Sequence, residues 1–430
     1  MYTFTVAVKT LDKSKVSLFP MLLTAFIDLL GVGIVIPVLP ALFLDLSSGI
    51  FPQSFGVSGR AVILGVLMAA YPFAQFIGAP ILGALSDRKG RKPVLILSLT
   101  GTLIGYILFA LGIIYSNVWI LFFSRLLDGF TGGNISTIYS AIADISNEKE
   151  KIKRFGYVGM AIGIGFILGP FIGGTLADKH LFSYFQYSMP FWFVAALCFV
   201  NILLVIYKFS ETLENKLNSK MDPLIGFKNT AKAFKIPNMR TLFTVSFILA
   251  FGFNLFVQFF SIYLISKFEM TQSQVGRFFA YVGIWIAVSQ GILAGYVSRK
   301  MDSVKVLPPA IFLLATSIII LTLPERYTFM LLLLPFVAIF QGIIAPNINA
   351  VISNHADQTS QGEVMGINQS LVSLSQIFPP IIDGFLFSIS VDLPIIFSGI
   401  CTILGGILLV IFYSKNKWRK FSQVSNEVSN

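Results

Sequence analysis

A few ionisable residues lie deep inside long apolar runs of the sequence, and these residues are the first candidates for chemistry. Asp28 lies about twelve residues into the run from Val16 to Asp45, which is roughly 18 Å along a helix that rises 1.5 Å per residue. Its carboxyl has no partner within its own run. A charge at such a depth in a bilayer costs at least about 2.5 kcal/mol. We therefore expect a proton-binding or substrate-binding site at Asp28 rather than a structural role.

A second acidic residue stands close to an arginine. Arg125 and Asp128 are three residues apart in the run from Val118 to Ile145, so they would share one face of a helix and could pair. A self-neutralising structural pair and a role in coupling fit this spacing equally well. Asp383 lies in the outer half of a later apolar run, and we interpret it as a local feature near the outer surface.

A cluster of charges occupies the joint between two apolar runs. The stretch GALSDRKGRKPVL, from Gly83 to Leu95, places five charges within the six residues from Asp87 to Lys92. Asp87 would end the preceding helix, Gly90 would supply a turn, and the basic residues would hold the loop on one side of a membrane. A basic loop that only sets topology is the simpler alternative. Topology alone, however, requires neither Asp87 nor Gly90.

The elements that position these residues must be long helices. The 430 residues are 55% hydrophobic and 12% charged, with a mean hydropathy of +0.81. A helix needs about 20 mostly apolar residues to cross the hydrocarbon core of a bilayer, and it satisfies its own backbone hydrogen bonds there. We predict an all-α integral membrane protein with twelve transmembrane helices. The expected spans are Val16–Asp45, Arg60–Ser86, Lys92–Ser116, Val118–Ile145, Arg154–Asp178, Tyr187–Lys208, Met239–Lys267, Gln272–Lys300, Val304–Leu323, Thr328–Asn354, Ser360–Ser388 and Leu393–Ser414.

The formal net charge of +11 follows the expected topology. Basic runs fall on alternate connections between the spans, which is the pattern of the positive-inside rule. We expect a multi-pass protein of the cell's inner (plasma) membrane with both termini in the cytoplasm. The basic surface would then face anionic lipid, and no nucleic-acid partner is expected. The basic runs are Lys9–Lys15, Arg88–Lys92, Lys149–Arg154, Lys208–Arg240, Arg299–Lys305 and Lys415–Lys420.

Other kinds of chemistry find no support in the sequence. It contains no phosphate-binding loop, no metal-ligand cluster and no nucleophile with an adjacent base, so we expect neither an enzyme nor an ATP-driven pump. No cofactor or metal is expected. Cys198 and Cys401 both lie inside apolar runs, where a thiol behaves as a small apolar side chain, so no disulfide is expected either.

The chain divides into two related halves. A shift of 212 residues places Gly83 on Gly295 and Ser86 on Ser298, and further matches follow at nearly the same offset. Two six-helix repeats are typical of transporters that move around a site at the midplane. The expected domains are an N-terminal half at 1–208, a cytoplasmic linker at 209–238, a C-terminal half at 239–415 and a tail at 416–430. Apolar residues in the linker favour a short helix on the cytoplasmic leaflet, although a plain solvated linker fits nearly as well.

These motifs, taken in order, resemble the major facilitator superfamily, and within it the twelve-span drug:proton antiporters that include tetracycline efflux proteins. GALSDRKGRKPVL is similar to the signature between the second and third spans, and SRLLDG (Ser124–Gly129) to the fourth-span arginine motif. GFILGPFIGG (Gly165–Gly174) is similar to the glycine-proline motif of antiporters. IDLLGVGIVIPVLP in the first span resembles the tetracycline efflux group. The resemblance covers nearly the whole chain.

The resemblance gives the charged loop a role as a cytoplasmic gate. It implies that Asp87 lies at the N-terminus of the eleventh helix, near Ser360 to Gly362, where free amides and the helix dipole favour an anion. It also implies that Arg91 pairs with Asp144 at the cytoplasmic end of the fourth span. Such contacts would latch the halves when the cavity opens outward. The expected gate residues are Gly83, Asp87, Arg88, Gly90, Arg91 and Asp144.

The glycine-proline motif suits close packing of helices. Gly165, Gly169 and Gly173 recur at every fourth residue and would form a flat strip along the fifth span. Pro170 should bend this helix, and Gly174 ends the motif. Packing is the simpler interpretation, and control of a tight interface between the halves is an additional role that the motif supports equally well.

The resemblance implies a secondary active transporter that exports a small amphipathic compound, a drug or a metabolite, in exchange for protons by alternating access. It would work as a monomer, with Asp28, Arg125 and Asp128 as the proton-coupling or substrate residues. Proton-coupled uptake or facilitated transport of a metabolite or siderophore is an alternative with the same fold, and a transporter-like receptor is another. Gly105 and Ile286 stand where the tetracycline group has an acid and a histidine, which argues against tetracycline as the substrate.

Overall fold

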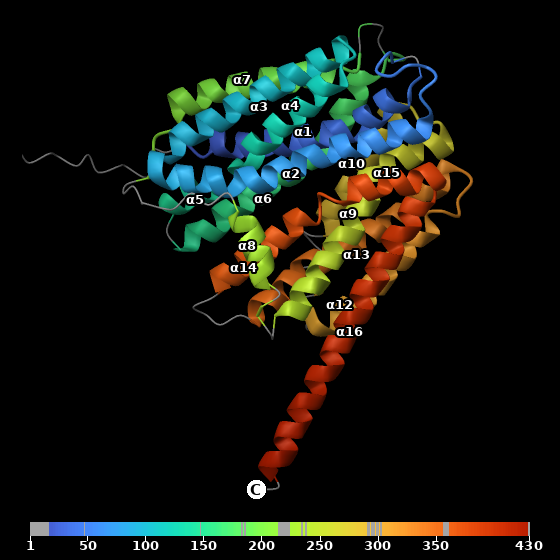
Figure 1. Ribbon diagram of the computed structural model, residues 1–430. Helices are drawn as coiled ribbons and strands as arrows, with labels where there is room; N and C mark the ends of the chain where they lie inside the picture. Colours follow the sequence, from blue (N-terminus) through green and yellow to red (C-terminus); the bar gives the residue numbers. More distant parts are fainter. Residues whose placement is uncertain are drawn as a thin grey trace, which may run out of the picture.

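The computed structural model describes residues 17–428, apart from 47, 147, 182–183, 185, 214–223, 234, 237–238, 290–292, 294–296, 298–300, 302 and 356–360. All regular secondary structure in these residues is helical. Figure 1 shows two bundles joined by α8, with α10 and α15 of the second bundle lying against the first. The first bundle contains α1 (Phe19–Leu44), α2 (Val57–Lys89), α3 (Arg91–Ile114), α4 (Val118–Thr131), η2 (Gly132–Asn134), α5 (Ile135–Asp144), α6 (Glu148–Ala177) and α7 (Met189–Lys208). The remaining helices are α8 (Ile225–Ala233), α9 (Arg240–Phe268), α10 (Gln272–Val288), α12 (Ser303–Ile320), α13 (Tyr327–Asn354), α14 (Gln361–Leu374), α15 (Pro379–Ile389) and α16 (Leu393–Val428).

The helices account for the twelve expected spans. Nine segments of the described chain are long and apolar enough to cross a membrane, with α14 and α15 counted together as one of them. The other three positions are α10, α12 and the span made of α4, η2 and α5. The prediction of an all-α fold with twelve helices in two halves is confirmed.

Two spans that the sequence presented as continuous are broken. The fourth span passes through a short 3-10 helix at Gly132–Asn134, and Gly133 leaves helical geometry with φ −72° and ψ 15°. The eleventh span is interrupted between Leu374 and Pro379. Pro379 and Pro380 carry no backbone N–H, so they fit the first turn of a helix, where those groups have no partner within the helix. They begin α15 for this reason.

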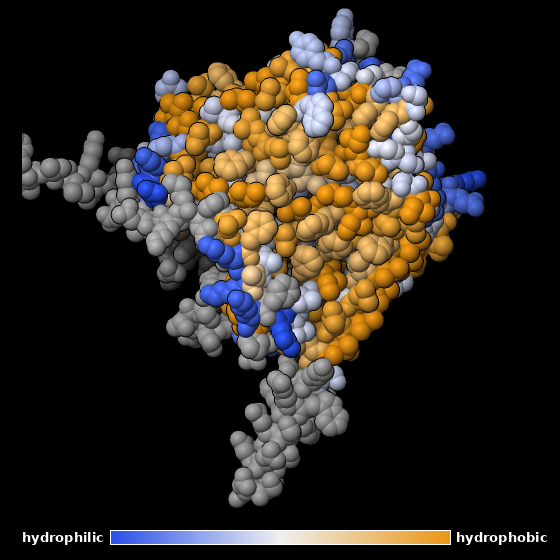
Figure 2. Space-filling model, viewed as in Figure 1, coloured by the Kyte–Doolittle hydropathy of each residue, from blue (hydrophilic) through white to orange (hydrophobic). Residues whose placement is uncertain are grey.

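The outer surface of the bundles is apolar, as a lipid environment requires. Figure 2 shows one face of the molecule covered by hydrophobic side chains, with hydrophilic residues gathered near its margins. Phe123, Leu332 and Phe385 are more than half exposed. A soluble protein rarely exposes such large contiguous apolar surface, so this surface and the apolar helices describe a multi-pass membrane protein.

The glycine strip of α6 packs inside the first bundle. A β-carbon on Gly169 would lie 2.6 Å from the carbonyl oxygen of Leu30, and one on Gly173 would lie 2.8 Å from Cα of Ile34. Gly165 approaches the carbonyl of Phe26 in the same way. The strip therefore lets α6 and α1 approach closely, which is the packing role expected of small residues.

The two bundles meet at one end of the molecule. We call the end that carries the Gly90 turn and α8 the basic end, and the end that carries Asp45, Tyr187 and Gln272 the opposite end. At the opposite end a β-carbon on Gly65 of α2 would lie only 2.1 Å from the carbonyl oxygen of Pro380. Gly174, the last residue of the glycine-proline motif, approaches the carbonyl of Gln272 in α10 similarly.

Candidate functional site

A cavity of about 340 Å³ lies between the two bundles. A second cavity of about 450 Å³ lies nearer the basic end and is lined by Gly83, Ser136 and Gly226 among others. Gln75 and Gln376 line both cavities, so the two adjoin. The inner cavity is lined by Leu29, Val32, Val35, Ile36, Met68, Tyr71, Pro72, Gln75, Arg125, Phe166, Phe253, Asn254, Val257, Gln258 and Gln376.

The linker helix α8 borders the outer of these two cavities. The ring of Phe227 packs edge-on against that of Phe76 in α2, with the centroids 4.9 Å apart, and Gly226 lies against the same ring. The expected helix in the linker is present. It packs against α2 and α14 at the cavity mouth.

Arg125 and Asp128 form the ion pair that their spacing predicts. Nη1 of Arg125 lies 3.3 Å from Oδ2 of Asp128, and both side chains are buried. The guanidinium stacks over the ring of Tyr71, 4.4 Å from its centroid. Arg125 lines the inner cavity whereas Asp128 does not. The pair thus turns its positive member toward the cavity. Gly105 allows this arrangement, because a β-carbon there would lie 3.0 Å from Cβ of Asp128.

Asp28 precedes Leu29, a residue of the cavity wall, in α1 but does not itself line the cavity. It is 5% exposed, and neither carboxylate oxygen makes a hydrogen bond with the described residues. Asp128 and the amide of Asn134 are the polar groups that act on it most strongly. A buried carboxylate without a partner is costly. This environment therefore suits a carboxyl that binds and releases a proton.

A chain of buried polar side chains crosses the break in the fourth span. Nδ2 of Asn134 donates to Oγ of Ser98 at 2.7 Å, and Ser98 donates to the carbonyl oxygen of Thr131 at 2.5 Å. The hydroxyls of Thr131 and Thr102 lie 3.2 Å apart. This chain was not predicted from the sequence, although the Gly-Gly-Asn sequence inside an otherwise apolar span was a signal for it.

Asp383 is fully buried, and its carboxylate makes no hydrogen bond with the described residues. The sequence did not predict this burial, and the expected position of Asp383 near the outer surface of the membrane stays a prediction. The neighbouring Gly384 explains the burial. A β-carbon on it would lie 2.8 Å from the carbonyl oxygen of Ala61, so α15 packs directly on α2 here.

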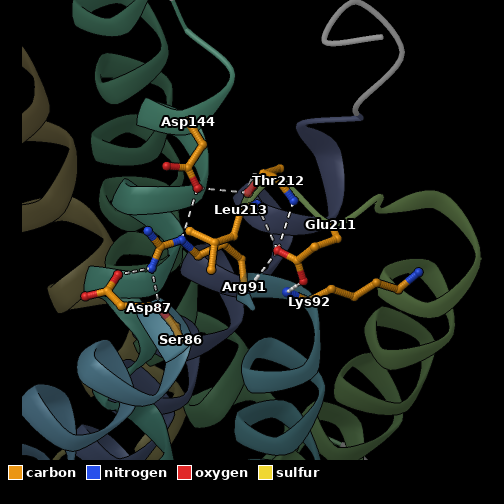
Figure 3. A network of polar contacts seen from close by, with 8 residues as sticks. All are labelled: Ser86, Asp87, Arg91, Lys92, Asp144, Glu211, Thr212 and Leu213. Carbon is orange, nitrogen blue, oxygen red and sulfur yellow. Dashed lines mark hydrogen bonds and ion pairs between the residues drawn. The ribbon is translucent and has the colours of Figure 1, made fainter. Parts of the chain in front are cut away.

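The charged loop forms a network at the basic end, shown in Figure 3. Nη1 of Arg91 donates to the carboxylate of Asp87 and, at 2.6 Å, to Oγ of Ser86. Nε of Arg91 donates to Oδ2 of Asp144 at 3.0 Å. The structure therefore contains the ion pair between Arg91 and Asp144 that the motif implies. Its function as a latch stays a prediction.

The start of the linker completes this network. The carboxylate of Glu211 accepts hydrogen bonds from the backbone N–H groups of Arg91 (2.8 Å) and Lys92 (3.1 Å), which are free donors at the start of α3. The hydroxyl of Thr212 donates to Asp144 at 3.1 Å. The role of Glu211 was not predicted from the sequence. An acidic residue three positions after the end of the sixth span was the only indication of it.

The other expected gate residues differ in their surroundings. Gly90 has φ +113°, a value that favours glycine, and a β-carbon there would collide with Glu211. Gly83 lies near Ser136 in the outer cavity. Arg88 is exposed and makes no hydrogen bond or ion pair with another described residue. The expected contact of Asp87 near Ser360 falls outside the residues that the structure describes.

Comparison with known proteins identifies the family. A model described as Major Facilitator Superfamily matches residues 21–325 and 291–426. The chain belongs to the Major Facilitator Superfamily. It is 29% identical over 413 residues to "Multidrug resistance protein 2" of Bacillus subtilis (strain 168), which covers 95% of this chain and 98% of that protein. It is 30% identical over 371 residues to "Tetracycline resistance protein, class E" of Escherichia coli, which covers 85% and 87%.

The fold agrees with this assignment. The crystal structure of a D-xylose-proton symporter superposes with a TM-score of 0.72 at 13% identity, covering 91% of this chain and 97% of that one. These findings confirm the predicted resemblance to the drug:proton antiporter family of the superfamily. The protein is a membrane transporter and not an enzyme.

In this major facilitator superfamily member, polar contacts join the two bundles at the opposite end. The hydroxyl of Tyr187 donates to Oδ2 of Asp45 at 3.2 Å and accepts from Nε2 of Gln272 at 3.1 Å. Burial and the neighbouring Asp45 raise the pKa of Tyr187 well above its usual range, so this hydroxyl keeps its proton. The contact links α1, the segment before α7 and the start of α10.

Asp178 makes a second polar contact across the bundles. Burial opposes its ionisation, but hydrogen bonds from Ser273, from the backbone N–H of His180 and from Thr271 outweigh that effect. The pKa of Asp178 is therefore held below its usual value. Thr271 and Ser273 belong to the N-terminal turn of α10, where a helix favours a negative charge. The opposite end is thus closed by both backbone packing and polar contacts.

Proposed function

We propose that the chain exports small amphipathic compounds, drugs or metabolites, in exchange for protons across the cell's inner membrane. Both termini and the basic end would then lie in the cytoplasm, following the distribution of basic residues. The drug-resistance names of its relatives support this substrate class. The two halves, residues 1–208 and 239–415, would move as bodies around the cavity, and a single copy of the chain contains the whole site.

The observation that carries the proposal is the position of Asp28. A buried carboxyl with no hydrogen bond from a described residue lies next in sequence to Leu29, which lines a cavity that both halves share. Next to it lies the pair of Arg125 and Asp128. When substrate enters from the basic end, the carboxyl would lose its proton toward the cytoplasm. When the opposite end opens, it would take up a proton as the substrate leaves. Each positive charge that moves inward gains about 2.3 kcal/mol per 100 mV of membrane potential.

Asp28→Asn tests this directly in proteoliposomes that contain the full chain. A substrate found by a thermal-shift screen of metabolites and antibiotics would be followed together with internal pH. We expect the variant to lose accumulation against a gradient while it keeps substrate binding and downhill exchange, because the amide cannot carry a proton. Asp383→Asn is the matched control, since it also removes a buried, unpartnered carboxyl.

Three outcomes would revise the proposal. Normal uphill transport by the Asp28→Asn variant would move the coupling elsewhere, with Asp128 the next residue to test. Protons that move in the same direction as the substrate would indicate symport and uptake. Substrate binding without counterflow would indicate a receptor.

A further inference from the structure

The charged residues near the inner cavity differ in whether they line it. Arg125, Asp28 and Asp128 are all at most 5% exposed, but only Arg125 is among the residues that line the cavity. None of the described residues that line either cavity is acidic. A bound molecule therefore meets a guanidinium first and reaches no carboxylate. An organic cation in this position would be repelled by its nearest charged neighbour, whereas an acceptor oxygen would be attracted.

Arg125 has donors to spare for such a ligand. Only Nη1 of its guanidinium has a hydrogen-bond partner among the described residues, and the buried Nε has none. The remaining amino group, Nη2, also has no partner among the described residues, and it is not enclosed as Nε is. A ligand with a carbonyl, phenol or carboxylate oxygen at the cavity wall could accept a hydrogen bond from it.

Carboxamides supply further hydrogen-bonding groups from both halves. Gln75 and Asn254 line the cavity and donate their N–H groups to the backbone carbonyls of Gly132 (3.0 Å) and Ala250 (2.8 Å), and their amide oxygens accept no hydrogen bond from a described residue. The side chains of Gln258 and Gln376 line the cavity and make no hydrogen bond with described residues. These amides can both donate and accept.

The remaining wall suits a flat aromatic molecule. Tyr71, Phe166 and Phe253 contribute rings, and most other lining residues are aliphatic. The volume of about 340 Å³ lies within the range of pockets that hold small organic ligands. Aromatic side chains stack favourably on planar ligands, so the apolar wall gives affinity and the polar groups give selectivity.

We propose that this cavity selects neutral or anionic aromatic compounds that carry carbonyl, phenol or carboxylate oxygens, and discriminates against organic cations. Arg125 and the amides of Gln258 and Gln376 are the groups that recognise the oxygens. The inference rests on the proposed export function, because it names the substrate class of the same cavity.

Binding to the purified full chain tests the inference without any need for transport. The probes are 1,4-dihydroxyanthraquinone, its 2-sulfonate and the tetraphenylphosphonium cation, measured by isothermal titration calorimetry at a pH where the first is neutral. We expect both anthraquinones to bind at least about tenfold more tightly than the cation. Gln258→Leu and Gln376→Leu should each weaken anthraquinone binding by about five- to tenfold, the usual worth of one hydrogen bond. The control is Gln53→Leu, an exposed site outside the cavity.

Tighter binding of the phosphonium cation would overturn the inference. So would unchanged anthraquinone affinity in both cavity variants with normal melting temperatures. The proposed function fails separately. Proton-driven uphill transport of the cation would overturn the substrate class and leave export intact, whereas selective anthraquinone binding without proton-coupled movement would support the class and overturn export.

Discussion

The two ends of the molecule are built from different kinds of contact. At the basic end, Arg91 binds Asp87 and Asp144, and all of these groups belong to the first bundle. At the opposite end, Tyr187 binds Gln272 across the bundles, and Gly65 brings α2 against the backbone of α15. The basic end therefore stiffens one half, while the opposite end joins two halves.

This difference defines the conformational state of the transporter. The cavities extend to the basic end, past Gly83 and Gly226, and the bundles touch at the opposite end. Arg91 and Asp144, which are proposed to latch the two halves together, here pair with each other inside the first bundle.

The largest expected effect comes from disturbing the opposite end. Gly65→Ala places a methyl group 2.1 Å from the carbonyl oxygen of Pro380, a backbone atom that cannot rotate away. We expect the opposite end to lose its closed state and transport to fall by at least about tenfold, because helix packing tolerates no such overlap. Ala61 is fully buried, so a cysteine introduced by Ala61→Cys should react with a membrane-impermeant maleimide only when Gly65→Ala opens this end.

The same substitution elsewhere in the membrane gives the control. Gly163→Ala in α6 meets no atom within 4 Å, so transport and labelling should stay at parental levels. If Gly65→Ala also left both unchanged, close backbone packing would not be what closes the opposite end.

An intermediate effect is expected at the basic end. Arg91→Ala or Asp144→Ala removes one member of a partly buried ion pair, which should lower the stability of the protein by about 1 to 2 kcal/mol and impair transport several-fold. The exchange Arg91→Asp with Asp144→Arg should recover part of both losses. Transport assays and thermal unfolding of the same samples measure the two effects.

The exposed Arg88 is the matched control for charge. Arg88→Ala should change neither property, since the side chain makes no contact of this kind among the described residues. Normal transport in both single variants at the Arg91–Asp144 pair would remove this network from the transport cycle.

The smallest expected effect is the pH dependence of the polar contact at Asp178. Because the pKa of Asp178 is lowered in the folded protein, the ionised form of this carboxyl stabilises the fold more than the protonated form does. Its stabilisation is complete above the usual value of 3.8 and is lost as the pH falls through the lowered pKa. The melting temperature of the purified protein should therefore begin to fall below about pH 4. Asp178→Asn should abolish the part of this fall that comes from Asp178, and an unchanged acid profile in this variant would exclude the contact as its source.

The sequence was most informative where a structural feature depends only on residues close together in the chain. Apolar runs predicted the spans, and the spacing of Arg125 and Asp128 predicted their pair, because a helix alone brings them together. Glu211 meets the start of α3 only because the linker folds back 120 residues along the chain. Asp383 is buried because another helix covers it. Contacts of this kind depend on tertiary packing, which periodicity does not encode.

The short 3-10 segment at Gly132–Asn134 has a mechanical consequence. It separates a rod that carries Arg125 and Asp128 from a rod that ends at Asp144. No continuous ladder of α-helical hydrogen bonds connects them, so rigid geometry does not fix the orientation of one rod relative to the other. Arg125 in the cavity wall and Asp144 in the charged network therefore belong to the same span but lie on opposite sides of this short 3-10 segment.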